Sequence, residues 1–136
     1  YKRQPTLSAA DNITLPLRLS HTKVDKEWFD HITGMLGITE RLGHKPSQMS
    51  GGQQQRVAVA RALVTRPDVI VADEPTGALD SEASGDLLTF LRHCVDDLGQ
   101  TVVMVTHDHD AAARADDIVT VTDGQVSTAR SQEALA

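Results

Sequence analysis

Two stretches that lie close together in the sequence constrain what this chain can fold into. The first, at the start of an apolar helical pattern, is Ser50-Gly51-Gly52-Gln53. Free N–H groups and the positive end of a helix dipole meet at such a start, which favours a bound anion. The second is the apolar run at residues 69–72, which stops at Asp73 and Glu74. A parallel strand delivers such carboxylates to the ligand-binding edge of an α/β sheet, so the two stretches indicate phosphate and a divalent cation.

The chain continues with a second unit of the same kind. An apolar helical pattern that starts after Asp80 is followed by a β-branched run at residues 101–106, which ends at His107. Two consecutive units of strand and helix predict an α/β fold, in which parallel strands are joined by helical crossovers. After them, residues 118–126 are expected to form a hairpin around Asp123 and Gly124.

Upstream of the Ser-Gly-Gly stretch, the sequence predicts helices only. Ser8 is expected to cap a short helix, and Pro16 disfavours the continuation of that helix. Apolar residues at helical spacing predict a second helix over about residues 24–36. Trp28 and Phe29, which lie in this second helix, are interpreted as packing anchors rather than as a platform for stacked bases.

Composition excludes several classes of function. A chain of 136 residues with 40% apolar residues can form a core of ordinary size. Its net charge of −6 argues against a nucleic-acid partner. A nucleotide stays compatible with an acidic protein, because local N–H groups and Mg²⁺ can hold it. The lone cysteine, Cys94, permits no internal disulfide and is expected to be buried.

The order and spacing of these motifs resemble the nucleotide-binding subunit of ABC transporters, most of all its bacterial macrolide-export and lipoprotein-release branch. By this resemblance, residues 50–53 are the signature motif, residues 69–73 the Walker B strand, and His107 the switch histidine. The D-loop is Ala78-Leu79-Asp80. The resemblance implies the C-terminal part of a RecA-like P-loop ATPase core, with its parallel strands and helical crossovers, preceded by a small α-helical subdomain.

The resemblance also implies a division of the chain into domains. Residues 1–48 form a partial helical (signature) subdomain, residues 49–127 the C-terminal half of the RecA-like core, and residues 128–136 a tail. The chain is therefore expected to be the C-terminal portion of a longer subunit. None of its four lysines follows a glycine, so it lacks the Gly-x-x-x-x-Gly-Lys-Ser/Thr phosphate loop. Strands that the missing half would cover are expected to be exposed.

The resemblance assigns a role to each residue of the site. Asp73 orients Mg²⁺ through coordinated water, Glu74 polarises the attacking water, and His107 contacts the γ-phosphate of ATP. The residues that contact ATP held by the opposite subunit of a head-to-tail dimer are Ser50, Gly51, Gly52 and Gln53. Asp80 lies at the same dimer interface. Phosphoryl transfer needs such a division, because a metal neutralises the phosphate oxygens while a separate group positions the nucleophile.

Each motif also has a purely structural interpretation. The Ser-Gly-Gly tripeptide is compatible with a glycine turn and a serine cap, and Asp80 with a helix cap. Asp73 and Glu74 are compatible with a strand-ending turn; on an extended chain they point in different directions and suit two roles. The cluster His107-Asp108-His109-Asp110 has no metal-binding partner nearby in sequence, so a helix capped by Asp108 is preferred to a metal site.

The function implied by the resemblance is ATP hydrolysis that energises transport across a membrane. The implied cofactors are ATP and Mg²⁺. The implied partners are a second nucleotide-binding subunit, in a homodimer, and transmembrane permease subunits, at the cytoplasmic face of the plasma (inner) membrane. This chain alone is expected to be inactive. The alternative is a non-catalytic donor of the signature loop, or a truncated remnant that does not hydrolyse ATP alone.

Overall fold

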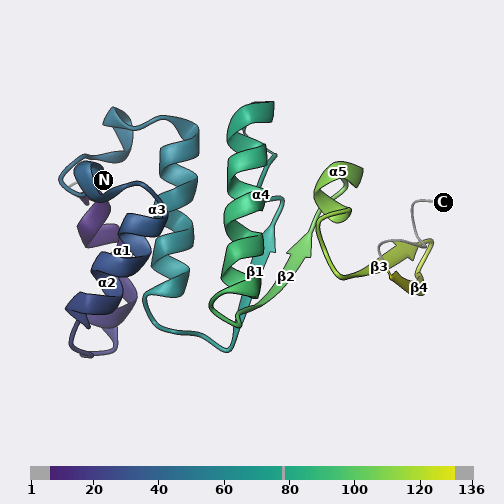
Figure 1. Ribbon diagram of the computed structural model, residues 1–136, viewed down its shortest axis with the longest axis horizontal. Helices are drawn as coiled ribbons and strands as arrows, with labels where there is room; N and C mark the ends of the chain where they lie inside the picture. The colour runs from purple at the N-terminus through teal and green to yellow at the C-terminus, as the bar shows by residue number, and fades with distance from the viewer. Residues whose placement is uncertain (1–6, 78, 131–136) are drawn as a thin grey trace, which may run out of the picture.

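The computed structural model describes residues 7–77 and 79–130, and its elements run from a helical block to a C-terminal hairpin (Figure 1). The helices are α1 (Ala9–Leu19), α2 (Lys26–Met35), α3 (Gly51–Leu63), α4 (Ser81–Asp96) and α5 (His109–Ala112), with short 3-10 turns η1 (Thr39–Arg41) and η2 (Pro46–Gln48). The strands are β1 (Val69–Asp73), β2 (Thr101–Val105), β3 (Asp117–Thr122) and β4 (Gln125–Arg130). Among the described helices, none is long and apolar enough to cross a bilayer.

The helical block consists of α1, α2 and α3, which lie together at one end of the molecule (Figure 1). Its core is formed by buried aliphatic side chains, among them Ile13, Ile32 and Leu63. Trp28 of α2 packs against this core, and its indole Nε1 donates a hydrogen bond to the carbonyl of Leu63 at 3.0 Å. The guanidinium of Arg66 lies 4.8 Å from the centre of the Trp28 ring. Trp28 is thus an anchor between helices, as the sequence predicted.

Helix α1 continues past Pro16, which corrects the expectation that this proline disfavours continuation. An interior proline costs about 3 kcal/mol, because it lacks an N–H group and crowds the preceding turn. In α1 the residues Ala9, Ile13 and Leu17 are buried on one face. Full burial of each large side chain stabilises by about 1.5–3 kcal/mol. Packing against the core therefore offsets the cost of the proline.

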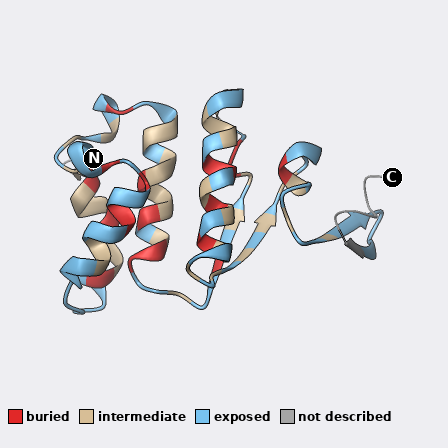
Figure 2. Cartoon of the chain, viewed as in Figure 1, coloured by how far each residue is buried: buried red, intermediate tan, exposed pale blue. Residues whose placement is uncertain are grey.

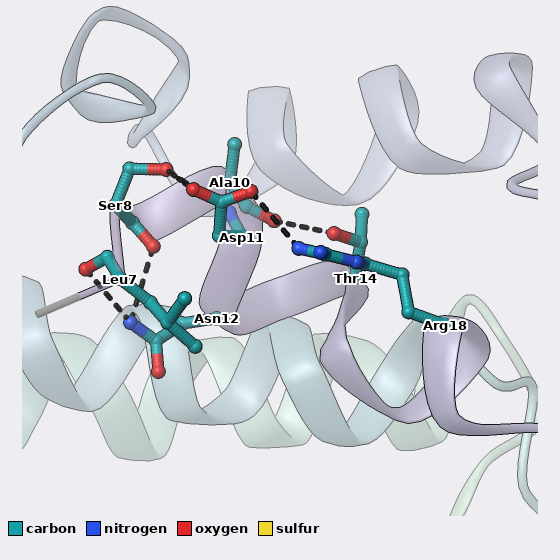
Figure 3. Close-up of polar contacts among 7 residues, drawn as sticks. All are labelled: Leu7, Ser8, Ala10, Asp11, Asn12, Thr14 and Arg18. Atoms are coloured by element: carbon teal, nitrogen blue, oxygen red, sulfur yellow. Dashed lines mark hydrogen bonds and ion pairs between the residues drawn. The ribbon is translucent and has the colours of Figure 1, made fainter. Parts of the chain in front are cut away.

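Polar contacts along α1 hold its first turns in place (Figure 3). The Ser8 hydroxyl accepts a hydrogen bond from the Asp11 N–H at 3.1 Å and donates to the Asp11 carboxylate at 2.7 Å. Arg18, near the other end of the helix, donates to the same carboxylate at 3.2 Å. The cap at Ser8 is thus confirmed, and the ion pair, which is exposed, contributes little to stability.

The two units of strand and helix form the parallel pair that the sequence predicted. Strand β1 pairs with β2 in parallel, with Val69 opposite Thr101 and Asp73 opposite Val105. Helix α4 connects them. Strands β3 and β4 form the predicted hairpin, and both turn residues, Asp123 and Gly124, have positive φ. Because β4 runs to residue 130, the tail predicted from residue 128 begins as part of a strand.

One face of the β1–β2 sheet is covered and the other is open. Helix α4 contributes buried residues to the covered side, namely Leu87, Leu88, Leu91 and Cys94. Valines of both strands are exposed, with accessibilities from 48% to 70%: Val69, Val71, Val103 and Val105. Figure 2 shows that buried residues lie mainly in the helical block and α4, whereas β3 and β4 are exposed almost throughout. Exposure of the strands was predicted, and it is unusual for parallel strands, which are normally covered on both faces.

Candidate functional site

The first part of the site is the start of α3, where Ser50 and Gln53 cap each other. The Ser50 hydroxyl accepts a hydrogen bond from the Gln53 N–H at 3.2 Å. The Gln53 side-chain oxygen accepts one from the Ser50 N–H at 3.0 Å. Gly51 and Gly52 form the first turn, and their N–H groups have no acceptor among residues 7–77 and 79–130. The serine cap is confirmed, and it leaves two N–H groups available for an anion at the positive end of the helix.

The starts of α3 and α4 lie next to each other. Asp80 caps α4, because its carboxylate accepts a hydrogen bond from the Ala83 N–H at 2.8 Å. A Cβ atom added to Gly52 would lie 3.3 Å from the Cβ of Ala83, so a side chain there would press on α4. The capping role of Asp80 is confirmed, whereas its role at a dimer interface stays a prediction. Ala78, the first residue of the predicted D-loop, lies outside the described residues.

The second part of the site is the edge where β1 and β2 end. The Nδ1 atom of His107 lies 2.8 Å from Oε1 of Glu74. The backbone N–H of His107 donates to the same oxygen at 3.2 Å, and the Thr106 hydroxyl donates to Oε2 at 3.4 Å. The parallel register thus brings together two predicted residues that are 33 positions apart in the sequence. Thr106 was not predicted as a site residue, and its only signal in the sequence is its place at the end of the second apolar run.

The backbone at Glu74 differs from the extended chain that the sequence indicated. Asp73 is the last residue of β1, but Glu74 has φ of +44°, in the left-handed region. Its N–H still donates to the Val105 carbonyl at 2.8 Å, and its carbonyl accepts from the Gly77 N–H at 3.1 Å. A non-glycine residue in this region costs about 1–3 kcal/mol and persists only where its surroundings hold it. The turn therefore directs the Glu74 carboxylate toward His107, and the cost is local backbone strain.

Asp73 presents the other carboxylate of the site to solvent. It is exposed, and no partner of its side chain lies within residues 7–77 and 79–130. The described residues hold no group of three or more His, Cys, Asp and Glu side chains that could hold a metal. Asp73 thus fits a Mg²⁺ ion that takes its other ligands from phosphate and water. Asp108 caps α5 through the N–H groups of Asp110 and Ala111, as the sequence favoured.

The contact between Glu74 and His107 shifts the pKa of both groups. The hydrogen bond from His107 lowers the pKa of Glu74, and the same bond raises the pKa of His107. The stabilisation from the raised histidine pKa is complete below 6.5 and is lost as the pH rises through the shifted value. The stabilisation from the lowered carboxyl pKa is complete above 4.5 and is lost as the pH falls through its shifted value. The pair is therefore strongest between these two ordinary values.

We expect the substitution Glu74→Gln to lower the pKa of His107, because it removes the negative charge beside the imidazole. The imidazole signals of the unmodified protein and of the variant are followed by NMR over pH 4–9. A matched substitution, Glu82→Gln, removes an exposed carboxylate from the first turn of α4. This control is expected to leave the titration midpoint of the His107 imidazole unchanged. An unchanged midpoint in Glu74→Gln would contradict the contact.

This fold and site define an α/β protein of the RecA-like ATPase class. The chain belongs to the ABC transporter family, whose model matches residues 2–77. It is 46% identical over 128 residues to the macrolide export ATP-binding/permease protein MacB of Burkholderia thailandensis, covering 93% of this chain and 19% of that protein. It is 41% identical over 125 residues to the lipoprotein-releasing system ATP-binding protein LolD of Francisella tularensis, covering 90% of this chain and 54% of that protein.

A solved structure agrees with this assignment. The chain superposes on the ATP-binding cassette MJ0796, in a dimeric post-hydrolysis state bound to ADP and Pi, with a TM-score of 0.77 and 37% identity. The match covers 95% of this chain and 59% of that one. The chain thus spans about a fifth of the length of MacB and about half of the length of LolD. The predicted family and fold are confirmed.

Proposed function

We propose that this chain supplies the signature loop and the hydrolytic carboxylate of an ABC-type ATPase. The observation that carries the proposal is the Glu74 carboxylate, which His107 and Thr106 hold at the carboxyl edge of the sheet. An intact carboxylate in this arrangement favours the catalytic subunit over a non-catalytic donor of the signature loop. The phosphate loop and the remaining strands would come from sequence that precedes this chain in a longer subunit.

The residues of the chain perform separate steps in this proposal. ATP with Mg²⁺, when bound, supplies the phosphoryl group and a cation that neutralises its charge. Asp73 holds the cation, directly or through water. Glu74, whose pKa is lowered by the hydrogen bond from His107, is an ionised carboxylate that orients and polarises the attacking water. His107 uses one ring nitrogen for Glu74, and its side chain is 87% exposed, so the other nitrogen is accessible to a γ-phosphate.

The start of α3 acts on a second subunit in this proposal. Ser50, Gly51, Gly52 and Gln53 contact the γ-phosphate of ATP held by the partner, and Asp80 lies at the same interface. The dimeric state of MJ0796 supports this arrangement. The name of MacB, an ATP-binding/permease protein, supports permease partners. A position at the cytoplasmic face of the inner membrane is part of the same proposal. The domain division at residues 48 and 127 stays a prediction.

Concentration dependence tests whether the site is shared between two subunits. For the full-length protein, specific ATPase activity is expected to rise with protein concentration and then reach a plateau, because only the dimer has a complete site. The 136-residue chain alone is expected to show no turnover and no tight ATP binding. Phosphate release is measured over a wide range of protein concentrations, with excess ATP and Mg²⁺. A specific activity that stays constant while the full-length protein remains monomeric would contradict a shared site. Turnover by the 136-residue chain alone would contradict the dependence of this chain on a preceding phosphate loop.

A further inference from the structure

We propose that Gln55 is a positioning residue for Glu74, which it acts on through a hydrogen bond to Pro75. This inference rests on the function proposed above and adds to it a connection between two parts of one chain. Gln55 lies in the second turn of α3, just after the signature loop. Pro75 directly follows Glu74. The hydrogen bond therefore joins the helix that begins with the signature loop to the turn that carries the carboxylate.

The length of this bond is normal for an amide hydrogen bond in a protein. The Nε2 atom of Gln55 donates to the Pro75 carbonyl at 2.8 Å in a partly buried position. Pro75 itself is buried. Water therefore competes poorly with this bond, and a lost donor would leave a buried carbonyl without its partner.

The hydrogen bond from Gln55 matters because the backbone of Glu74 is strained. With φ of +44°, Glu74 needs restraints on both of its sides. On the strand side, its N–H donates to the Val105 carbonyl at 2.8 Å. On the other side, the Glu74 carbonyl accepts a hydrogen bond from the Gly77 N–H at 3.1 Å, and Gln55 holds the carbonyl of Pro75 in the peptide group that follows. Without Gln55 the turn can relax, and the carboxylate can leave the position in which His107 holds it.

Helix α3 is well placed to transmit this restraint, because the residue after Gln55 ties it to two other segments. Arg56 pairs with Asp86 of α4 at 2.7 Å and donates to the Leu36 carbonyl at 3.2 Å. In the proposed dimer, the start of α3 contacts the partner's ATP, whereas Glu74 acts on the nucleotide of its own subunit. Gln55 thus links the two sites, and a displacement of α3 at one site reaches the carboxylate of the other.

The test is the substitution Gln55→Glu in the full-length protein. It keeps the shape of the side chain but replaces the donor with an oxygen that repels the Pro75 carbonyl. We expect kcat for ATP hydrolysis to fall about tenfold, the scale of one lost hydrogen bond. KM for ATP is expected to change less than about twofold, because no proposed ATP contact is removed. Gln55→Lys, which restores a donor, is expected to recover most of kcat.

The chain offers a matched control at the other end of β1. Gln100 Nε2 donates to the carbonyl of Pro67, also at 2.8 Å and partly buried. Gln100→Glu therefore removes the same kind of bond far along the strand from Glu74. It is expected to lower the melting temperature about as much as Gln55→Glu does, but to leave kcat unchanged.

Three results would overturn the positioning role. These are an unchanged kcat in Gln55→Glu, an equal fall of kcat in Gln100→Glu, and a loss that appears only in KM. The ATPase activity of the unmodified full-length protein distinguishes a failure of the proposed function from a failure of the inference about Gln55. If it does not hydrolyse ATP, the proposed function fails. If it hydrolyses ATP but Gln55→Glu behaves as Gln100→Glu does, only the inference about Gln55 fails.

Discussion

Replacing Glu74 with glutamine in the full-length protein is expected to lower kcat for ATP hydrolysis at least about 100-fold. The amide has the shape of the carboxylate, and its oxygen can still accept the hydrogen bond that His107 donates to Oε1. It carries no charge, however, and cannot polarise or deprotonate water. Binding of ATP is expected to persist, because Glu74 is proposed to act on the water and not on the nucleotide. Turnover is measured by phosphate release and binding by titration with a fluorescent ATP analogue.

A second readout distinguishes a chemical defect from a folding defect. If ATP binds but is not hydrolysed, the shared site stays filled, and the variant is expected to accumulate as a dimer on gel filtration with ATP. Glu82→Gln changes an exposed carboxylate at the start of α4 in the same way, and it is expected to keep the turnover of the unmodified protein. Full turnover in Glu74→Gln would favour the alternative of a non-catalytic donor.

The parts of the site that could be predicted depend on contacts between residues close in sequence, or on the rules of parallel sheets. The cap between Ser50 and Gln53 spans three positions, and the turn at Asp123 and Gly124 spans two, so local chemistry is sufficient for both. Glu74 and His107 are far apart in the sequence. Because both follow apolar strands, and because parallel strands place their carboxyl ends at one edge, their common position at that edge was predictable, whereas the hydrogen bond between them was not predicted.

The parts that were missed depend on how elements distant in the sequence pack against one another. Pro16 lies inside α1 because the buried face of the helix outweighs a local penalty, and the size of that burial is known only from the packing. The left-handed backbone of Glu74 is set by its ladder bond to Val105 and by the turn to Gly77. The bond from Gln55 to Pro75 depends on α3 lying beside the turn that follows β1. A row of three glutamines in the sequence does not indicate which of them reaches that carbonyl.

The head-to-tail arrangement can be tested with a second variant, one that alters the signature loop. Gly51 is exposed in the first turn of α3, and it is absent from the residues with positive φ. An aspartate is therefore compatible with the backbone there, and its charge is favourable at the start of a helix. The same charge repels a γ-phosphate. Gly51→Asp is thus expected to fold and to abolish turnover in a homodimer, as Glu74→Gln does.

When the two inactive proteins are mixed and allowed to exchange subunits, ATP turnover is expected to return. In a mixed dimer, the subunit with Gly51→Asp has an intact Glu74, and its nucleotide faces the intact signature loop of the other subunit. One of the two sites is then complete. Statistical exchange makes half of the dimers mixed, so activity is expected to reach about a quarter of that of the unmodified protein if the two sites act independently. If each signature loop acted on the nucleotide of its own subunit, both sites of the mixed dimer would be defective and the mixture would stay inactive. As a control, the two variants carry different tags, and mixed dimers are purified through both tags before the assay. This purification shows that exchange has occurred. Inactivity of the purified mixed dimer would then contradict the head-to-tail site.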